Sequence, residues 1–237
     1  MRARKNICGT FTMIDINTHA LFGIDDGAKT IDDSIEMLKV ARANGITTCV
    51  LTPRCVLHKR GATDRFLNLR EKNFNQLVSL GLKDAPNLLL GAQVLMDHDL
   101  SLHDNIKKLC IANGKYLLIE LPNFARIPDF EEWIYCLNMK GIIPIIAQIE
   151  KYPLWEELIE HSADLNLYYQ VNAKSFKGLF KKKIIKKLLS MQKKFFVASE
   201  MHDSKQAKNM KKAFNNAKKR YPDCFSSFFL NDFNFSK

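Results

Sequence analysis

Long hydrophobic runs are missing from this sequence. No apolar segment approaches the roughly 18–20 residues that a helix needs to span a bilayer. Residues 1–12 are basic at Arg2, Arg4 and Lys5 and lack the apolar stretch that defines a signal peptide. We therefore expect no transmembrane segment and a cytoplasmic location.

Paired cysteines are missing as well. The six cysteines are scattered, and no two have the C-x-x-C spacing of a zinc knuckle or a thioredoxin-type site. Cys55 follows Arg54, but the C-x5-R motif of cysteine-dependent phosphatases would need arginine at position 61, which is Gly61. There is no G-x-G-x-x-G or Walker loop, so nucleotide binding has no support. Reduced, mostly buried thiols are expected.

The net charge of +11 is unevenly distributed. Lys174 to Arg220 contains sixteen Lys and Arg against two acids, whereas the rest has twenty basic and twenty-three acidic residues. This segment is a candidate surface for a polyanion or an anionic membrane. Its Lys181–Lys194 part also fits a simpler interpretation, an amphipathic helix with a solvated lysine face. No nucleic-acid motif accompanies the charge, so nucleic acid is not expected as a partner.

Short apolar runs alternate with amphipathic segments along the chain. This alternation predicts parallel strands joined by helical crossovers, with function at the carboxyl ends of the strands. We expect an α/β fold, a closed or nearly closed barrel of seven strands, with an open doubly wound sheet as the alternative. The expected domain spans residues 13–220, between an N-terminal extension (1–12) and a C-terminal tail (221–237). The strands are predicted at Met13–Ile16, Thr47–Thr52, Leu88–Val94, Tyr116–Leu121, Ile142–Ile149, Leu167–Asn172 and Phe195–Ser199, and the helices at Ile31–Ala43, Asp64–Leu80, Asp129–Lys140, Leu154–Ser162, Lys181–Met191 and Lys205–Arg220.

Polar residues follow the predicted strands in a recurring way. The first strand ends in D-I-N-T-H (15–19) and is followed by G-I-D-D-G (23–27). Later strands end in T-P-R (52–54), G-A-Q (91–93), I-E-L-P (119–122), A-Q-I-E-K-Y (147–152) and A-S-E-M-H (198–202). Because parallel strand ends meet at one face, these side chains are expected to converge there.

These segments, in this order, resemble the PHP-type (polymerase and histidinol phosphatase) manganese-dependent protein-tyrosine phosphatases of bacterial capsule and exopolysaccharide operons. The resemblance covers about Met13 to Arg220 and rests on the D-x-H-[ST]-H and G-[IV]-D-D-G patterns of that family. It implies a distorted (β/α)7 TIM-like barrel of the PHP type. It also implies a cluster of two or three divalent metals, manganese or similar ions, that activates water and binds the phosphate of phosphotyrosine.

Carried over by position, the resemblance implies that metal ligands survive at some positions and are replaced at others. The surviving ones are His19, Glu120, Glu200 (an aspartate in the family) and His202. The replaced ones are Asn17, Arg54 and Gln148, where the resemblance implies histidine, and Gln93, where it implies glutamate. Neutral amides are weak ligands for transition metals, and a guanidinium repels a divalent ion at close range. We therefore expect either no metal or a single divalent ion.

Arg54 suggests what replaces the lost metals. A buried acid that has lost its metal needs another cation, and Arg54 is expected to pair with Glu120 and Glu200. The expected phosphate-binding residues are Arg54, Lys151 and Lys205. The other histidines, His58, His98, His103 and His161, lie in loop or helix-end contexts and are expected at the surface.

The sequence favours the first of three functional interpretations, and the other two are its alternatives. The first is a pseudophosphatase that has lost its metal cluster and still binds phosphotyrosine or phosphate. The second is an active protein-tyrosine phosphatase with one or two metals on the surviving ligands. The third is a polyanion-binding module that uses the basic Lys174–Arg220 face. The partner implied by the resemblance is a bacterial tyrosine kinase or its phosphorylated tail.

Overall fold

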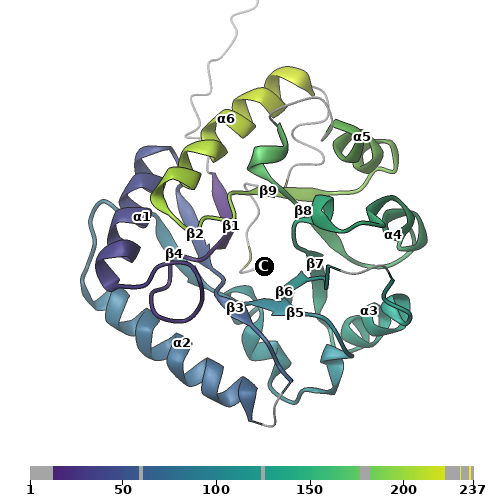
Figure 1. Cartoon of the computed structure of the whole chain (residues 1–237), viewed down its shortest axis with the longest axis horizontal. Helices are drawn as coiled ribbons and strands as arrows, with labels where there is room; N and C mark the ends of the chain where they lie inside the picture. Colours follow the sequence, from purple (N-terminus) through teal and green to yellow (C-terminus); the bar gives the residue numbers. More distant parts are fainter. Residues whose placement is uncertain are drawn as a thin grey trace, which may run out of the picture.

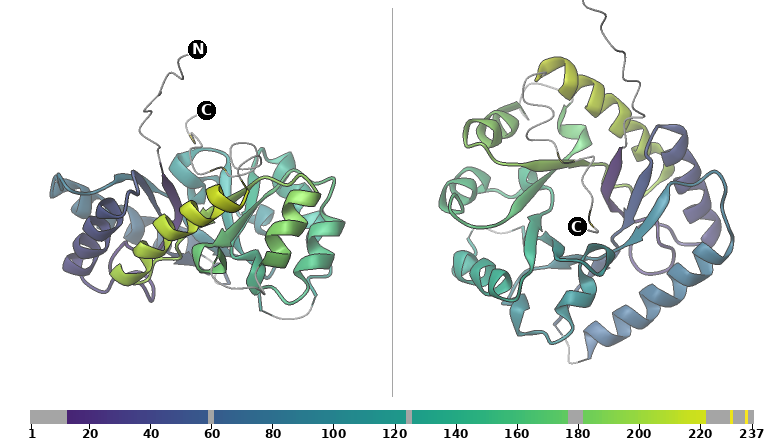
Figure 2. Two further views of the ribbon diagram at one scale, coloured as in Figure 1. Left: turned by 90° about the horizontal axis from the view of Figure 1, so that it is seen from above. Right: turned by 180° about the vertical axis from the view of Figure 1, so that it is seen from behind.

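The predicted strands lie in a ring with the helices on its outside (Figure 1). This computed structural model describes residues 13–58, 61–123, 126–176, 182–221, 230 and 235. Seen from behind, the helices again surround the strands (Figure 2). The mixed α/β fold with parallel strands is thus confirmed. Within the described residues no helix is long and apolar enough to cross a membrane.

The strands and helices follow the predicted order. The strands are β1 (Ile14–Thr18), β2 (Thr48–Leu51), β3 (Arg54–Cys55), β4 (Asn87–Leu90), β5 (Gln93–Leu95), β6 (Tyr116–Glu120), β7 (Ile143–Ile146), β8 (Tyr168–Asn172) and β9 (Phe195–Ala198). The α-helices are α1 (Ile31–Ala43), α2 (Ala62–Ser79), α3 (Phe130–Met139), α4 (Trp155–His161), α5 (Lys182–Ser190) and α6 (Ser204–Arg220). Short 3-10 turns are η1 (Leu100–Leu102), η2 (Ile106–Leu109), η3 (Ile111–Asn113), η4 (Ile149–Lys151) and η5 (Ala173–Phe176).

The strands form two parallel sheets rather than one continuous ladder. Three strands pair in the order β1-β2-β4, and six pair in the order β3-β5-β6-β7-β8-β9. At the open edge between β1 and β9, a single bridge joins Thr18 to Met201, and the His19 amide donates to the Met201 carbonyl at 2.8 Å. The described backbone therefore surrounds a centre without a closed hydrogen-bonded barrel.

Two predicted strands are each divided in the structure. The segment predicted as Thr47–Thr52 is followed after Pro53 by β3, and Leu88–Val94 separates into β4 and β5. Proline donates no backbone hydrogen bond, so the ladder of β2 stops before it. At the second break Gly91 is packed so closely that an added Cβ would lie 3.2 Å from Thr52 Cγ2. The sequence pattern shows the apolar run but not this change of pairing partner.

The core consists of an outer and an inner cluster. The larger one lies between strands and helices, and it includes Leu38 and Met37 of α1. The smaller one takes alternate residues from strands around the ring, such as Ile16 and Phe196, and is therefore the ring's interior. Phe235, within the predicted C-terminal tail, is also buried in it, with its ring 5.7 Å from that of Phe196. The expected domain limits stay a prediction, and the expected N-terminal extension lies outside the described residues.

Helix ends agree with the predicted bounds within two residues, and those of α1 agree at both ends. Thr30 forms a capping box with Asp33, each side chain accepting a hydrogen bond from the other residue's backbone N–H. Asn44 is the C-cap, and Gly45 then takes a φ of +89° that favours glycine. This helix follows the loop of residues 20–30, which carries some of the polar side chains near the carboxyl ends of the strands.

Candidate functional site

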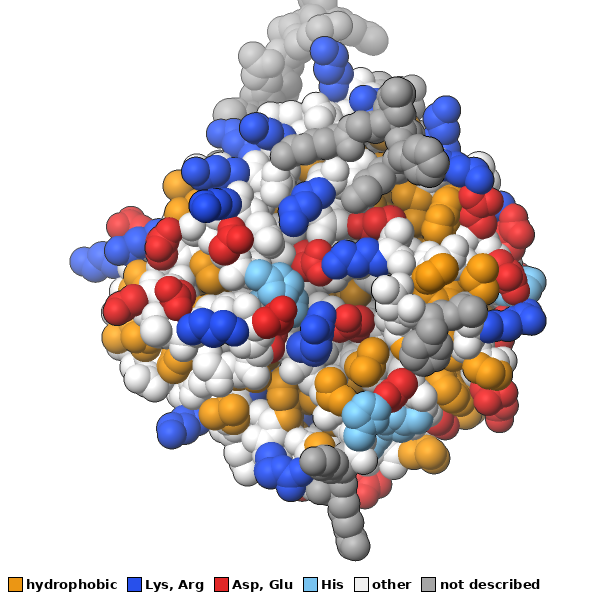
Figure 3. All heavy atoms as spheres, viewed as in Figure 1, with side chains coloured by type: hydrophobic (Ala, Val, Ile, Leu, Met, Phe, Trp, Pro, Cys, Tyr) orange, Lys and Arg blue, Asp and Glu red, His pale blue; other side chains and the backbone are white. Residues whose placement is uncertain are grey.

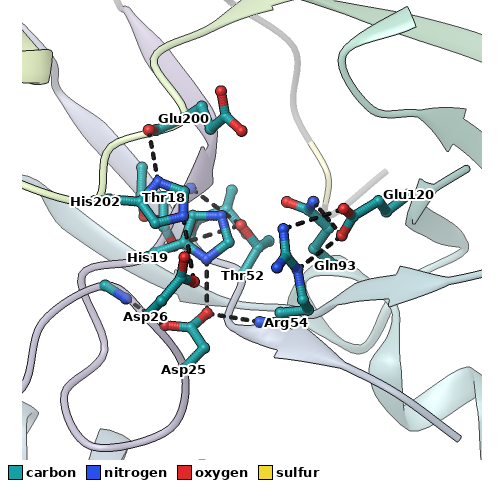
Figure 4. A network of polar contacts seen from close by, with 12 residues as sticks. Thr18, His19, Asp25, Asp26, Thr52, Arg54, Gln93, Glu120, Glu200 and His202 are labelled. Carbon is teal, nitrogen blue, oxygen red and sulfur yellow. Dashed lines mark hydrogen bonds and ion pairs between the residues drawn. The ribbon is translucent and has the colours of Figure 1, made fainter. Parts of the chain in front are cut away.

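Two histidines from opposite ends of the chain meet at the carboxyl face of the ring (Figure 4). His19 follows β1 and is fully buried, and His202 follows β9 and is partly buried. Their rings stack with centroids 3.9 Å apart and planes inclined by 22°. The His202 Nδ1 lies 3.0 Å from the backbone oxygen of Glu200. The edge between β1 and β9 thus places two imidazoles side by side.

A carboxylate from the loop after β1 orients the first imidazole. Asp25 Oδ2 lies 2.6 Å from His19 Nδ1 and also accepts the backbone N–H of Arg54 at 2.7 Å. Burial acts to raise the pKa of Asp25, but hydrogen bonds and charge from His19, with the Arg54 and Gly27 amides, hold it below its ordinary value. An ionised Asp25 favours a proton on Nδ1 of His19. The buried Nε2 of His19, which has no hydrogen-bond partner among the described residues, then carries the lone pair.

The loop can reach His19 because Gly27 has no side chain. A Cβ added to Gly27 would lie 2.0 Å from the His19 carbonyl oxygen, far closer than any real contact. The Ala28 amide donates to the same oxygen at 3.0 Å. Asp26 therefore comes to lie beside the histidine pair, with one oxygen 3.5 Å from His202 Nε2. One ligand atom each from His19, Asp26 and His202 lies within 4.8 Å of the others.

These three side chains fit a single divalent ion. Two imidazoles and a carboxylate are a common ligand set for a catalytic metal, with positions left for water or substrate. The unpartnered Nε2 of His19 is the atom that would complete such a site, and the Asp25 carboxylate behind it is the usual supporting group.

A second part of the centre is built on an arginine. Arg54 of β3 contacts Glu120 of β6 through two bonds, Nε to Oε2 at 2.9 Å and a terminal nitrogen to Oε1 at 3.1 Å. Gln93 of β5 donates to the same carboxylate at 2.9 Å. The guanidinium neutralises the charge of Glu120, and the N–H groups of Arg54 and Gln93 already occupy both of its oxygens. The carboxylate is therefore not available to a metal cation. The residues here do not fit a second metal.

Glu200 has a separate partner. Its side chain contacts Lys151 Nζ at 2.7 Å and accepts from the Asn172 amide at 2.7 Å. Its backbone is left-handed, with φ of +53°, a costly conformation for a residue other than glycine. The expected pairing of Arg54 with both glutamates is therefore correct for Glu120 and wrong for Glu200.

Neutral side-chain amides lie between the histidine pair and the two glutamates. Asn17 donates to Gln170 Oε1 at 3.2 Å, and the Gln148 backbone N–H donates to the same oxygen at 2.8 Å. The side-chain oxygens of Asn17 and Gln148 are buried without a partner. Amide oxygens are weak ligands for transition metals, so these amide side chains do not fit a second such ion.

The structure brings together most, but not all, of the residues singled out from the sequence. His19 and His202 meet, while Glu120 and Glu200 are engaged by protein cations. Lys205 lies exposed on the first turn of α6, outside this network. Asp25 and Asp26 were not singled out as site residues, although the G-I-D-D-G segment that contains them was the available signal. Asn172 and Gln170 carried no signal beyond lying in a strand.

A hollow of about 220 Å³ adjoins the centre. It is lined by Glu120, Leu121, Pro122, Asn123, Ala147, Gln148, Lys151 and Tyr152. Lys151 is 62% exposed, so its ammonium lies at the rim of the hollow as well as against Glu200. The hollow offers apolar surface beside charged groups of the centre.

The basic C-terminal segment is partly neutralised. Lys183 and Lys187 of α5 form ion pairs with Glu156 and Glu160 of α4. Lysines of α6 such as Lys208 are exposed, and basic side chains gather over this helix (Figure 3). The basic segment therefore contains one helix, α5, with lysines in ion pairs, and another helix, α6, with exposed lysines.

Fold and site together define a parallel α/β protein of the barrel-like class, with its polar centre at the carboxyl ends of the strands. Residues 13–232 match the family model described as "Capsular polysaccharide synthesis, CpsB/CapC". The chain belongs to this CpsB/CapC family.

Individual relatives agree with this assignment. CapC of Staphylococcus aureus is 33% identical over 237 aligned residues, which cover 92% of this chain and 89% of CapC. The tyrosine-protein phosphatase YwqE of Bacillus subtilis is 32% identical over 81% of this chain and 78% of its own. A crystal structure from the study of YwqE and of CpsB from Streptococcus pneumoniae, described as metal-dependent tyrosine phosphatases, superimposes with a TM-score of 0.72 at 26% identity, covering 88% of this chain and 87% of that one. This protein is thus a relative of metal-dependent tyrosine phosphatases of capsule synthesis.

Proposed function

We propose that this protein hydrolyses phosphotyrosine in a protein substrate with a single divalent metal ion held by His19, Asp26 and His202. The observation that carries the proposal is the buried Nε2 of His19, which has no partner and lies beside His202 and Asp26. A buried polar atom without a partner is costly, and a bound cation would remove that cost. An ion held there would supply Lewis-acid polarisation of a phosphoryl oxygen.

The charge balance of the centre supports a bound cation. Asp25, Asp26, Glu120 and Glu200 carry four negative charges, and the cations Arg54 and Lys151 each already contact one of the glutamates. A phosphate dianion entering this centre would meet excess negative charge. One divalent ion balances the two unpaired negative charges, so phosphate recognition and metal binding are expected to go together.

The chain's own residues have distinct parts in this proposal. Asp25 holds the proton of His19 on Nδ1 and keeps Nε2 as the free donor of a lone pair. Lys151, at the rim of the hollow, is placed to meet a phosphate oxygen, and Leu121, Pro122 and Tyr152 line the place for an aromatic ring. The proposed substrate is a phosphotyrosine protein, in line with the relatives' names as tyrosine phosphatases. The particular substrate that the family resemblance implies is the phosphorylated tail of a bacterial tyrosine kinase.

One observation favours a second candidate, the pseudophosphatase that binds phosphotyrosine without hydrolysing it. The two-bond contact of Arg54 with Glu120 places a protein cation where the family resemblance implies a metal ligand. In that case Arg54 and Lys151 would have to release their glutamates to bind phosphate.

Metal content and turnover, measured together, separate the two candidates. The protein, purified without chelators, is assayed for bound manganese by mass spectrometry and for hydrolysis of a phosphotyrosine peptide with Mn²⁺ supplied. We expect about one manganese ion per chain, and loss of both this manganese and turnover in His202→Ala. His161→Ala, an exposed histidine at the end of α4, is the matched control and should change neither. Metal-free protein that binds the peptide without turnover would establish the pseudophosphatase instead.

A further inference from the structure

Three histidines outside the centre form a connected group with one carboxylate, which two of them contact. His58 follows β3, Asp97 and His98 follow β5, and His103 is the C-cap of η1. Asp97 Oδ2 lies 3.0 Å from His58 Nε2, and its Oδ1 lies 2.6 Å from His98 Nδ1. The other nitrogen of His98, Nε2, lies 2.7 Å from His103 Nε2. Histidines expected as separate surface residues thus form a connected group.

The short contacts of His98 restrict where its proton lies. Its Nε2 faces another imidazole nitrogen, so one of the two must donate and the other must accept. If Nε2 of His98 donates, its Nδ1 has a lone pair that faces a carboxylate oxygen at 2.6 Å. Only a shared proton or a cation makes that contact favourable.

The group has a route for an ion from solvent. An open hollow of about 350 Å³ is lined in part by His58, His103, Asp64 and Asp104. The His58 side chain is 54% exposed, and that of Asp97 is 20% exposed. Figure 3 shows histidine side chains gathered at two places on this face, at its middle and toward its lower right.

We propose that this group is a second divalent-metal site, of the zinc class, distinct from the centre that contains His19. One ligand atom each from His58, Asp97 and His98 lies within 4.8 Å of the others. Imidazole and carboxylate are the ligand types that zinc prefers alongside thiolate. His103 accepts the Nε2 proton of His98 and orients its ring as a supporting residue. Protons on the ligand nitrogens leave to solvent as the ion binds.

A bound ion would join two strand ends that build the centre. His58 lies four residues after Arg54, and Asp97 lies four residues after Gln93. These two strands, β3 and β5, pair through Arg54 and Gln93, which both contact Glu120. The second site would hold the segments beyond this pair together. It does not depend on whether the centre hydrolyses phosphotyrosine.

The test uses full-length protein carrying His202→Ala, so that the first centre does not contribute. Co²⁺ is titrated as a spectroscopic substitute for Zn²⁺, and Zn²⁺ stoichiometry is measured by native mass spectrometry. We expect one ion per chain, with a rise in Tm when Zn²⁺ is added. Adding His98→Ala should weaken binding by at least tenfold, and His103→Ala by about tenfold or more.

His161→Ala in the same background is the control and should leave binding unchanged, because this exposed histidine lies on α4. Absence of Zn²⁺ and Co²⁺ binding in the His202→Ala protein would overturn the proposal. Binding that survives both His58→Ala and His98→Ala would overturn it too. Neither readout involves turnover, so an inactive first centre would not be mistaken for failure of this site.

Discussion

Arg54 of β3 and Glu120 of β6 reach each other across the intervening strand β5 and make two hydrogen bonds. Paired bonds of this kind fix both orientation and distance. The guanidinium therefore stays on Glu120 even though its side chain is 39% exposed. This contact separates the centre into a half that fits a metal, around His19, and a half held by protein cations.

Restoring ligands in the second half should increase metal binding. Arg54→His with Gln93→Glu removes the guanidinium from Glu120 and supplies an imidazole and a carboxylate, the residues that the family resemblance implies. We expect the double variant to bind at least one more Mn²⁺ per chain, with affinity at least about tenfold above the parent's for that additional ion. Metal analysis after equilibration in Mn²⁺ measures this. Arg54→Ala alone should bind no additional ion, and equal gains in both variants would contradict the explanation.

Removing the ammonium at the rim should affect substrate binding more than stability. Lys151→Ala is expected to raise KM for a phosphotyrosine peptide by about tenfold, a loss of about 1.4 kcal/mol in binding. The ion pair with Glu200 is largely exposed on the lysine side, so the free energy of unfolding should fall by less than about 1 kcal/mol. Steady-state kinetics and urea unfolding measure the two quantities. Lys208→Ala on α6 is the control, and an equal KM effect there would indicate general charge attraction instead.

Asp15 should make stability depend on pH. Burial raises the pKa of Asp15 from 3.8 to about 6, despite hydrogen bonds from Ser199 and Asn17. The folded protein then holds this proton more tightly than the unfolded chain, so the Asp15 contribution to stability falls as pH rises from about 4 through about 6. Asp15→Asn keeps an oxygen for the two backbone donors and loses this dependence.

Relative to the variant, the parent should therefore lose about 2 kcal/mol of stability between pH 4 and pH 7. Urea unfolding of both proteins across this range measures the difference. The exposed Asp84→Asn is the control and should follow the parent at every pH. A constant difference between parent and Asp15→Asn would show that the buried carboxyl has an ordinary pKa.

Arg70 should be important for stability although it has no part in the proposed chemistry. It is 1% exposed, and its terminal nitrogens donate to the carbonyls of Gly91 and Lys108 at 3.0 and 2.9 Å. Arg70→Met removes both bonds and should cost about 3 kcal/mol, which corresponds to a fall in Tm of about 6–12 °C. Calorimetry measures this, and the exposed Arg65→Met on the same helix should change Tm by under about 2 °C.

The sequence predicts the fold well because its signals are local. The bounds of α1 follow from apolar spacing and from the Asn44-Gly45 end, and both depend on residues within one segment. The division of Leu88–Val94 into β4 and β5 could not be predicted in this way. It depends on which neighbour each half pairs with, and the packing of Gly91 against Thr52 comes from another strand.

The sequence predicted only those residues of the centre that lie at or shortly after the end of a strand. His19 and His202 were found because each lies in a polar segment that follows a strand and matches the family resemblance. Asp26 was missed because it reaches the pair through a loop that folds back, and that path depends on the contact of Gly27 with His19. Glu200 was assigned the wrong partner because its left-handed backbone, which directs the side chain to Lys151, leaves no trace in the sequence pattern.

Asp25 accepts one hydrogen bond from the ring of His19 and another from the backbone of Arg54, not from its side chain. A main-chain N–H is present whatever residue, other than proline, occupies position 54. The anchoring of His19 is therefore insensitive to the identity of that side chain. An exchange between imidazole and guanidinium at position 54 therefore leaves this support of His19 in place.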